Sequence, residues 1–222
     1  MAGAVDLGGC VPEHKKAKLY RRTKMHTLVA PEKIIDAKLL EKAAEIDVFT
    51  GFTAGHSGRV ASLTAAVGAA LHLVPDDIDM LKQAALLRDI GELRMDRDYI
   101  RAARILSAEE RLDLRRHSVI GEQEAAKLDA GRAVQLVIRW NHEWWNGSGY
   151  PDGLVREEIP LKSRILRVAD AYGALRSARP FRAAYPEASA KKYLIEWAGI
   201  EFDPMIVKVF LSLPAAADPF NV

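Results

Sequence analysis

The chain has a single cysteine, Cys10, among its 222 residues, so an internal disulfide is excluded. Cys10 lies in a glycine-rich start, and we interpret it as an inert thiol in a reducing compartment. The longest apolar stretch, 65–74, contains His72 and is too short to cross a membrane. No basic segment followed by an apolar one opens the chain, so no signal peptide is expected. These absences predict a cytoplasmic protein that does not enter a membrane.

An excess of charge of either sign is also missing. The formal net charge is +2, which gives the whole protein no electrostatic footprint for nucleic acid and no reason to seek an acidic partner. Basic residues gather only within 15–24, where the chain lacks a sustained apolar period. We therefore expect a flexible basic leader over 1–28 and one folded domain over 29–222, since 49% hydrophobic residues are enough for a sizeable core.

Sustained alternation of apolar and polar residues is absent, so strands are not expected. Apolar residues instead recur at helical spacing in segment after segment. Proline, aspartate, serine or glycine at the ends of several of these segments supplies start or stop signals. The segments begin near 31, 54, 75, 107, 132, 160, 186 and 203, and where the pattern also marks an end it does so near 49, 89, 128, 199 and 211. This pattern predicts an all-α protein, a bundle-like array of about seven to nine helices.

The stretch LLRDIGEL, 86–93, places a carboxylate at the end of an apolar helix. Ile78, Leu81 and Ala85 share one helical face, and Asp89 continues that face, with Gly91 expected to stop the helix. Burying an unpaired charge costs more than a hydrogen bond returns. Asp89 must therefore be paired with a cation, bound to a metal or placed at a cavity wall.

Four further potential ligands lie on inner faces or near helix ends: His56, His117, His142 and Asp170. Each alone is an ordinary feature of a protein core, because a buried histidine or aspartate is most often simply hydrogen-bonded. Together with Asp89, they come from separate helices of one small bundle. Imidazoles and carboxylates in a bundle interior suit iron, manganese or zinc.

The segment EWWNGSGYPDG, 143–153, must be a loop because three glycines surround Pro151. Its aromatic residues Trp144, Trp145 and Tyr150 need something to pack on. One interpretation is that the tryptophans fix the loop to the bundle. The other is that they form a docking surface for a protein partner.

These motifs together resemble the HD-GYP family. HSGRV at His56, LLRDIGEL, RRHSVIGEQEA at His117, NHEWWNGSGYPDGL and IPLKSRILRVADAYGALRSARPFR occur in the family's order and spacing, over about 52–213. The resemblance implies a helical fold that binds two or three metal ions, usually iron or manganese. It also implies hydrolysis of the bacterial messenger cyclic di-GMP to linear pGpG or GMP.

Carried over by position, the resemblance assigns His56, Asp89 and Asp170 to a first metal ion. Asp89 would bridge to a second ion, which His117 and His142 would also bind. In such a centre, two cations lower the pKa of a shared water, and the resulting hydroxide attacks phosphorus. Asp89 would thus be both a ligand and part of the catalytic centre.

The same resemblance identifies substrate-binding residues on either side of this centre. Gly149, Tyr150 and Pro151 would form the loop that gives the family half its name and would line the substrate cleft. Arg179 and Arg182 match basic positions that the family uses near the guanine or the phosphate.

Four positions depart from the family pattern. Arg88 and Asn141 stand where the family has histidines, so that each metal loses one imidazole. Glu92 replaces a lysine that would face phosphate, and Gly173 replaces a second acidic residue. An arginine about 4 Å from a dication would be repelled by about 8 kcal/mol at an effective dielectric constant of 20. Arg88 would therefore either lie between Asp89 and Asp170 in place of a metal or extend into solvent.

Three hypotheses follow from these departures. The first is a degenerate HD-GYP domain in cyclic di-GMP signalling, impaired or inactive in hydrolysis and retained as a nucleotide-binding or interaction module. The second is an active phosphodiesterase with an atypical, possibly mononuclear, site on Asp89, His117 and His142. The third is a scaffold that docks a diguanylate cyclase or another protein through the loop. We expect iron or manganese if any metal binds, with one ion or none rather than two.

Overall fold

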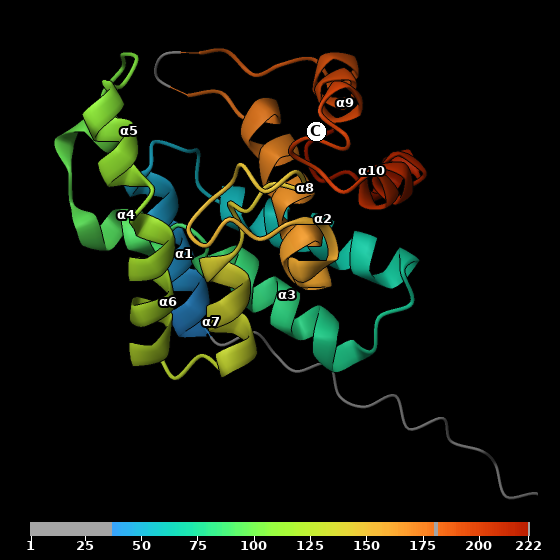
Figure 1. The fold of residues 1–222 in the computed structure, drawn as a ribbon, viewed down its shortest axis with the longest axis horizontal. Helices are drawn as coiled ribbons and strands as arrows, with labels where there is room; N and C mark the ends of the chain where they lie inside the picture. Colours follow the sequence, from blue (N-terminus) through green and yellow to red (C-terminus); the bar gives the residue numbers. More distant parts are fainter. Residues whose placement is uncertain (1–36, 180–181, 222) are drawn as a thin grey trace, which may run out of the picture. The chain divides into compact units, whose positions relative to one another are not determined.

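The computed structural model describes residues 37–179 and 182–221. Over these residues the chain forms ten α-helices and three short 3-10 helices, and no strand beyond two isolated bridges (Figure 1). The α-helices are α1 Ala37–Phe49, α2 His56–Ala70, α3 Pro75–Leu87, α4 Ile90–Met95, α5 Ala108–Leu114, α6 His117–Lys127, α7 Arg132–Arg139, α8 Leu161–Arg176, α9 Glu187–Glu196 and α10 Pro204–Leu211. The all-α prediction is confirmed.

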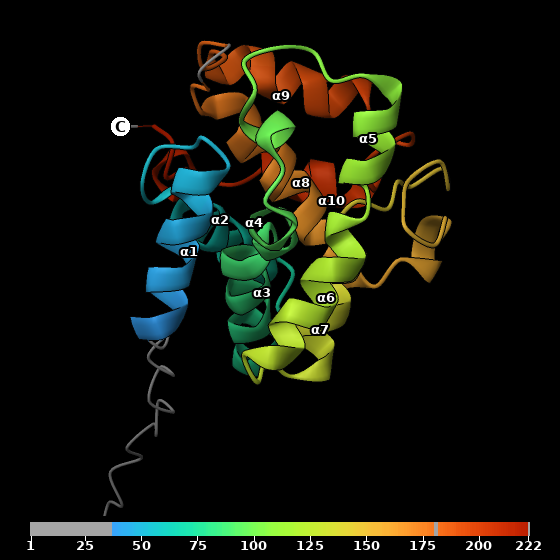
Figure 2. The same ribbon diagram turned by 90° about the vertical axis from the view of Figure 1, so that its left-hand side faces the viewer.

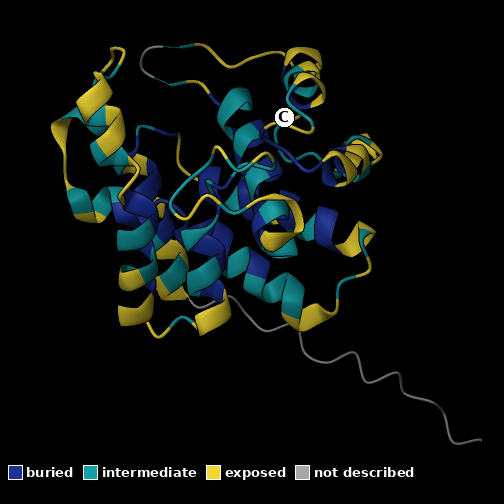
Figure 3. Cartoon of the chain, in the orientation of Figure 1, coloured by how far each residue is buried: buried dark blue, intermediate teal, exposed yellow. Residues whose placement is uncertain are grey.

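Helices α2, α3 and α8 supply much of the core, and α6 and α7 lie side by side in both ribbon views (Figure 2). Buried residues, dark blue in Figure 3, recur along these helices, and most of them are apolar. On α2, for example, Val60, Leu63 and Val67 are each at most 1% exposed. Their spacing of three and four residues is the one that predicted the helix.

The segment around Gly91 differs from expectation. The helix was predicted to continue to Asp89 and stop at the glycine, whereas α3 ends at Leu87 and a new helix, α4, runs through Gly91. A Cβ atom on Gly91 would lie 1.9 Å from the carbonyl oxygen of His117. The glycine is therefore required for close packing of α4 on the start of α6, and the chain turns at Arg88 and Asp89 instead.

Two further boundaries bear on the site. The segment 107–128 forms α5 and α6, and the predicted capping box at the start of α5 is present, with Ser107 and Glu110 bonded reciprocally. Helix α7 ends at Arg139, so Asn141 and His142 lie in the turn beyond it. Each of these interruptions places a site residue where a helix begins or ends.

The predicted leader, 1–28, and the predicted helix start at Pro31 lie outside the described residues. The domain boundary at 29 is therefore still a prediction. Among the described helices, none combines the length and the apolar character that crossing a membrane requires.

Candidate metal centre

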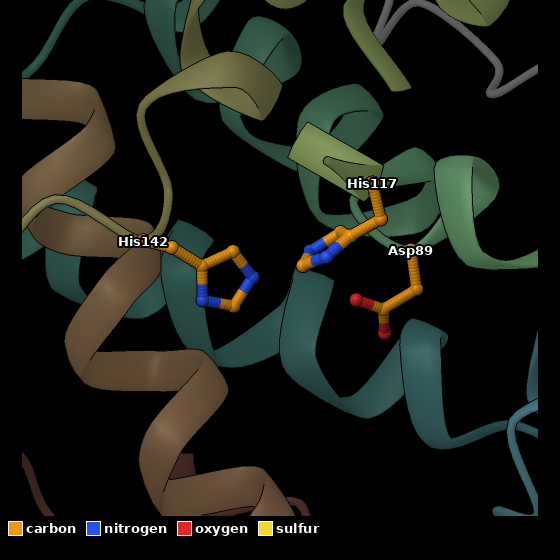
Figure 4. A group of neighbouring side chains, drawn as sticks. All are labelled: Asp89, His117 and His142. Carbon is orange, nitrogen blue, oxygen red and sulfur yellow. The ribbon is translucent and has the colours of Figure 1, made fainter. Parts of the chain in front are cut away.

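Asp89, His117 and His142 converge on one point, from the α3–α4 turn, the start of α6 and the turn after α7 (Figure 4). Each offers one ligand atom, and these atoms all lie within 4.8 Å of one another. The imidazole rings of the two histidines have their centroids 4.7 Å apart and nearly perpendicular planes. Three of the five predicted ligands are thus brought together.

His117 is oriented as a metal-binding histidine would be. Its Nδ1 atom lies 2.6 Å from the carbonyl oxygen of Leu114, which can only accept, so Nδ1 carries the hydrogen. The Nε2 atom keeps its lone pair and has no hydrogen-bond partner, although it is buried. Burial is the main cause that lowers the pKa of His117, so the ring is neutral near pH 7.

His142 differs from His117 in the group that its Nδ1 atom faces. Its Nδ1 atom lies 3.3 Å from a guanidinium nitrogen, Nη1, of Arg167 on α8. Its Nε2 atom is buried without a hydrogen-bond partner. Burial lowers the pKa of His142 well below the ordinary value, and His117 and Arg167 lower it further.

Arg88 lies between Asp89 and Asp170, as one of the two sequence-based alternatives expected. Its Nε atom donates to Asp170 at 2.6 Å, and its Nη2 atom lies 3.1 Å from Asp89. The side chain is 1% exposed, so it does not extend into solvent. The guanidinium therefore stands among the carboxylates that the resemblance assigns to the first metal.

The two aspartates respond differently to this arginine. Burial alone would raise the pKa of Asp170, but Arg88 and Arg167 outweigh it and hold the pKa below its ordinary value. Burial raises the pKa of Asp89, and Arg88 only partly opposes the change. The difference has a geometric cause, since Arg88 is hydrogen-bonded to Asp170 but only ion-paired with Asp89.

The other end of the Arg88 guanidinium is also fixed. Nη1 donates to the hydroxyl of Ser57 at 3.0 Å and to the carbonyl oxygen of Ala85 at 2.9 Å. The buried carboxylate of Asp47 in turn accepts from the backbone and hydroxyl of Ser57. A chain of buried polar groups from α1 through α2 thus holds the arginine.

His56 is placed apart from the other two histidines. Its ring stacks on Phe52 at a centroid distance of 3.6 Å, and its Nδ1 atom lies 3.0 Å from the hydroxyl of Ser177. Burial, and next Arg88, lower the pKa of His56 well below the ordinary value. The Nε2 atom of His56 is buried without a hydrogen-bond partner, whereas Asp170 of the same predicted set is bonded to Arg88. That His56 binds a metal is still a prediction.

The three other departures from the family pattern have distinct surroundings. Asn141 is fully buried, with its amide nitrogen 3.5 Å from Asp170 and its amide oxygen unpartnered. Burial raises the pKa of Glu92 to about 8, with Asp89 adding to the shift. A Cβ atom on Gly173 would lie 2.9 Å from Val60 and 3.0 Å from Phe220, so an acidic side chain there would require both neighbours to shift.

The predicted loop covers His142. The ring of Tyr150 stacks on the imidazole at 5.1 Å with an angle of 6° between the planes, and the backbone N–H of Tyr150 donates to the His142 carbonyl. Gly149 allows this approach, since a Cβ atom there would lie 2.2 Å from the backbone nitrogen of Trp144. The Tyr150–Pro151 peptide bond is cis.

Glu143, which sequence reasoning did not single out, holds the far side of the loop. Its carboxylate is buried and accepts from the backbone N–H groups of Asp152, Gly153 and Leu154 at 2.7, 3.0 and 3.1 Å. A run of backbone donors facing one carboxylate is a strong anchor.

The loop tryptophans contact the bundle. Trp144 packs edge-on against Trp197, and Trp145 lies under the guanidinium of Arg164. The backbone N–H of Trp145 also donates to the carbonyl oxygen of Glu201. These contacts favour the interpretation that the tryptophans fix the loop. A diguanylate cyclase or other protein partner stays a prediction.

A cavity of about 430 Å³ opens beside the centre and includes His142 and Asp170 in its wall. Arg179 and Arg182 also line it, as the resemblance expects of substrate-binding residues. Arg179 stacks over Phe52 at 4.1 Å and forms no ion pair with a carboxylate of the described residues. Arg182 donates to the carbonyl oxygens of Ala174 and Leu175 at the end of α8. Their role in binding is still a prediction.

The two metal positions differ in how well their residues fit an ion. The first is filled by the Arg88 guanidinium, which offers only donors and a positive charge. The second brings together a carboxylate and two imidazoles, the residue types of a transition-metal site, and the buried Nε2 atom of His117 offers its lone pair there. The residues of the second position therefore suit a metal ion better than those of the first.

Sequence reasoning missed Arg167, Glu201, Glu143 and the Asp47–Ser57 pair. Each is polar and buried or nearly so, but its partner comes from a distant segment, as with Arg167 and Glu201. Glu201 lies between two predicted helices and carried no sequence signal, and the others lay beside predicted site residues or in predicted helices, which does not identify a partner.

The comparisons with known proteins agree with this geometry. The protein-family description that matches is the HD domain, over residues 38–206. The cyclic di-GMP phosphodiesterase response regulator RpfG of Xanthomonas campestris is 34% identical over 172 residues, which cover 76% of this chain and 45% of that protein. The 3'3'-cGAMP-specific phosphodiesterase 3 of Vibrio cholerae is 34% identical over 159 residues, 72% of this chain and 35% of that protein. The chain thus spans less than half the length of these relatives.

Among solved structures, a cyclic GMP-AMP-specific phosphodiesterase of V. cholerae, V-cGAP3, superposes with a TM-score of 0.62 at 21% identity, over 78% of this chain and 47% of that one. The HD domain of the Listeria monocytogenes phosphodiesterase PgpH gives a TM-score of 0.52 at 15% identity, over 79% and 94%. At these identities the likeness concerns the fold. With the family match over most of its length and with the motif order above, the chain belongs to the HD domain family and, within it, to the HD-GYP group.

Proposed function

We propose that this domain serves cyclic dinucleotide signalling by binding a nucleotide such as cyclic di-GMP, and that it hydrolyses the nucleotide slowly or not at all. The observation that carries the proposal is the Arg88 guanidinium between Asp89 and Asp170. A centre that needs two cations cannot place one beside this arginine unless the side chain leaves its buried position.

The balance of charge around the centre supports the same conclusion. Three guanidinium groups face three carboxylates, and a fourth, Glu92, has a pKa of about 8 and is mostly protonated at pH 7. The guanidiniums are those of Arg88, Arg167 and Arg179, and the carboxylates are those of Asp89, Asp170 and Glu201. With the buried Asp47 carboxylate, which is linked to Arg88 through Ser57, the formal sum of these charges is −1, and a dication would leave one positive charge in excess.

The proposed ligand class comes from the relatives and the cavity. The matching proteins are named as phosphodiesterases of cyclic di-GMP or 3'3'-cGAMP. The cavity beside the centre is lined by Arg179 and by tyrosines Tyr185 and Tyr193. Guanidiniums suit phosphate oxygens and aromatic rings suit nucleobases, so the lining supports a nucleotide as the ligand.

The experiment compares the wild type with an Arg88→His/Asn141→His variant, which returns both missing imidazoles. Cyclic di-GMP binding is measured by calorimetry, and turnover is measured with added Mn²⁺ or Fe²⁺. We expect both proteins to bind the nucleotide and only the variant to hydrolyse it efficiently. Arg94→His, on the exposed face of α4, makes a similar replacement away from the centre and should leave turnover at the wild-type level. Rapid hydrolysis by the wild type would refute the proposal.

A second candidate is a phosphodiesterase that works with a single ion, iron or manganese, on Asp89, His117 and His142. The convergence of these three residues within 4.8 Å favours it. An ion held there would supply Lewis-acid activation of water, while Tyr150 shields His142. His117→Ala should then abolish a metal-dependent activity that the wild type possesses. Unchanged activity in that variant would remove this candidate.

A further inference from the structure

Arg167 on α8 lies against the centre, although the sequence motifs did not single it out. Its Nη2 atom donates to Glu201, and its Nη1 atom lies 3.3 Å from Nδ1 of His142 and 3.7 Å from Asp170. The Nε atom is buried and has no hydrogen-bond partner. One guanidinium thus lies close to a residue of each metal position that the resemblance assigns, His142 of the second and Asp170 of the first.

The position of Arg167 is fixed by Glu201. This carboxylate is 3% exposed as a residue, and its second oxygen accepts from the hydroxyl of Tyr193 at 3.0 Å. The backbone N–H of Glu201 donates to Trp197 at the end of α9. Rotation of Arg167 away from His142 would leave a buried carboxylate without its cation, which is strongly unfavourable.

The contact determines which nitrogen of His142 carries hydrogen. An arginine has donors and no acceptors, so Nδ1 of His142 must accept from it. A neutral imidazole has one N–H group, which therefore lies on Nε2, the other ring nitrogen. A doubly protonated ring would set a donor and a like charge against the guanidinium.

The two histidines of the centre are consequently opposite in kind. His117 donates through Nδ1 to the Leu114 carbonyl and presents a lone pair on Nε2. His142 accepts on Nδ1 and presents an N–H group. A metal-binding histidine normally donates its outer nitrogen to a carbonyl or carboxylate, as His117 does. His142 has the reverse arrangement.

We propose that Arg167 is a positioning residue that makes His142 a hydrogen-bond donor instead of a metal ligand, so that the second metal position binds a divalent cation less tightly than it would without this arginine. The inference goes beyond the proposed function, which depends on the first metal position, and it opposes the single-ion candidate.

The test is the affinity of the full chain for Co²⁺ alone, measured by calorimetry and by the visible absorption of the bound ion. The variant Arg167→Met/Glu201→Gln removes the guanidinium together with its buried counter-charge. The control Arg164→Met/Asp203→Asn makes the equivalent change at another pair of an α8 arginine and a buried carboxylate, whose atoms are 2.6 Å apart. We expect the first variant to bind Co²⁺ at least about tenfold more tightly than the wild type, and the control to match the wild type.

Equal affinity in the wild type and the folded Arg167 variant would overturn the inference. A second measurement uses the unaltered protein and does not depend on folding of a variant. Long-range ¹H–¹⁵N spectra, assigned with His142→Gln and His117→Gln, should show hydrogen on Nε2 of His142 and on Nδ1 of His117. Hydrogen on Nδ1 of His142 would refute the proposal. Neither measurement uses a cyclic nucleotide, so failure here is distinct from failure of the proposed function.

Discussion

Replacement of Arg88 by methionine removes the guanidinium from the centre while keeping an unbranched side chain of similar length. Asp170 then loses a donor at 2.6 Å, and Asp89 loses an ion-pair partner at 3.1 Å. At an effective dielectric constant of about 20, the shorter contact alone has a Coulomb energy of about 6 kcal/mol. Part of this energy compensates for burying the charges, and removing one member of such a pair typically costs about 3–5 kcal/mol.

We therefore expect Arg88→Met to lower the free energy of unfolding by about 3–5 kcal/mol at pH 7. For a domain of this size, the corresponding fall in Tm is about 6–20 °C. The measurement is urea denaturation followed by circular dichroism, with thermal unfolding as a second reading. Arg94→Met is the control, since Arg94 is exposed and lies 3.4 Å from Glu124, and it should cost less than about 1 kcal/mol.

The loss should also depend on pH, with a sign that the pKa shifts determine. In the wild type the pKa of Asp170 is held below its ordinary value, so its ionised form stabilises the fold above about pH 4, and this contribution is lost as pH falls. Without Arg88, burial leads the pKa of Asp170 to rise, and protonation at lower pH relieves the variant. The difference between the two proteins should shrink from pH 7 to about pH 4.5. A loss below about 1 kcal/mol, or one that does not change with pH, would refute this account of Arg88.

Three further predictions concern packing, titration and the loop. Gly91→Ala should lower the free energy of unfolding by on the order of 3 kcal/mol, because its Cβ would lie 1.9 Å from the His117 carbonyl oxygen. The control Gly58→Ala has open space around its Cβ and should be neutral or stabilising by up to about 1 kcal/mol, so equal Tm values for the two variants would contradict this reasoning. Because burial raises the pKa of Glu92 to about 8, the folded protein keeps a proton that the unfolded chain releases, and the wild-type free energy of unfolding should fall between about pH 5 and 8. The stability of Glu92→Gln should change less over this range, and parallel pH–stability curves for the two proteins would count against the shift. Glu143→Gln should speed amide hydrogen exchange at residues 152–154 more than Glu158→Gln does, because Glu143 accepts from three backbone N–H groups of the loop and Glu158 from one. Unchanged exchange in Glu143→Gln would exclude Glu143 as the anchor of the loop.

The sequence predicted the helices well because their apolar residues recur at one period along each segment. It could not predict where helices break at the site. Gly91 has the appearance of a stop signal, yet it lies inside α4, because the backbone of α6 approaches too closely for any side chain. This approach is a contact between segments more than twenty residues apart, and the spacing of apolar residues within either segment does not indicate it.

The candidate site could also be predicted only in part, because its contacts join residues that are distant in the sequence. The motif resemblance identified the residues, and Arg88 was expected to lie either between the two aspartates or in solvent. Only the folded chain, with Ser57 and the Ala85 carbonyl holding the guanidinium, decides between these alternatives. The contact of Arg167 with His142 was not predicted, since nothing local to α8 indicates that Glu201 will fix the arginine there.

Glu201 also joins two parts of the chain that a ligand or partner could reach separately. Its carbonyl oxygen accepts from Trp145 of the loop, and its carboxylate holds Arg167. The loop cannot shift at Trp145 without breaking that bond or moving Glu201, and through it Arg167. A ligand that shifts Trp145 enough to move Glu201 would therefore also move Arg167, and by reciprocity a ligand that moves Arg167 would change the affinity of whatever shifts the loop.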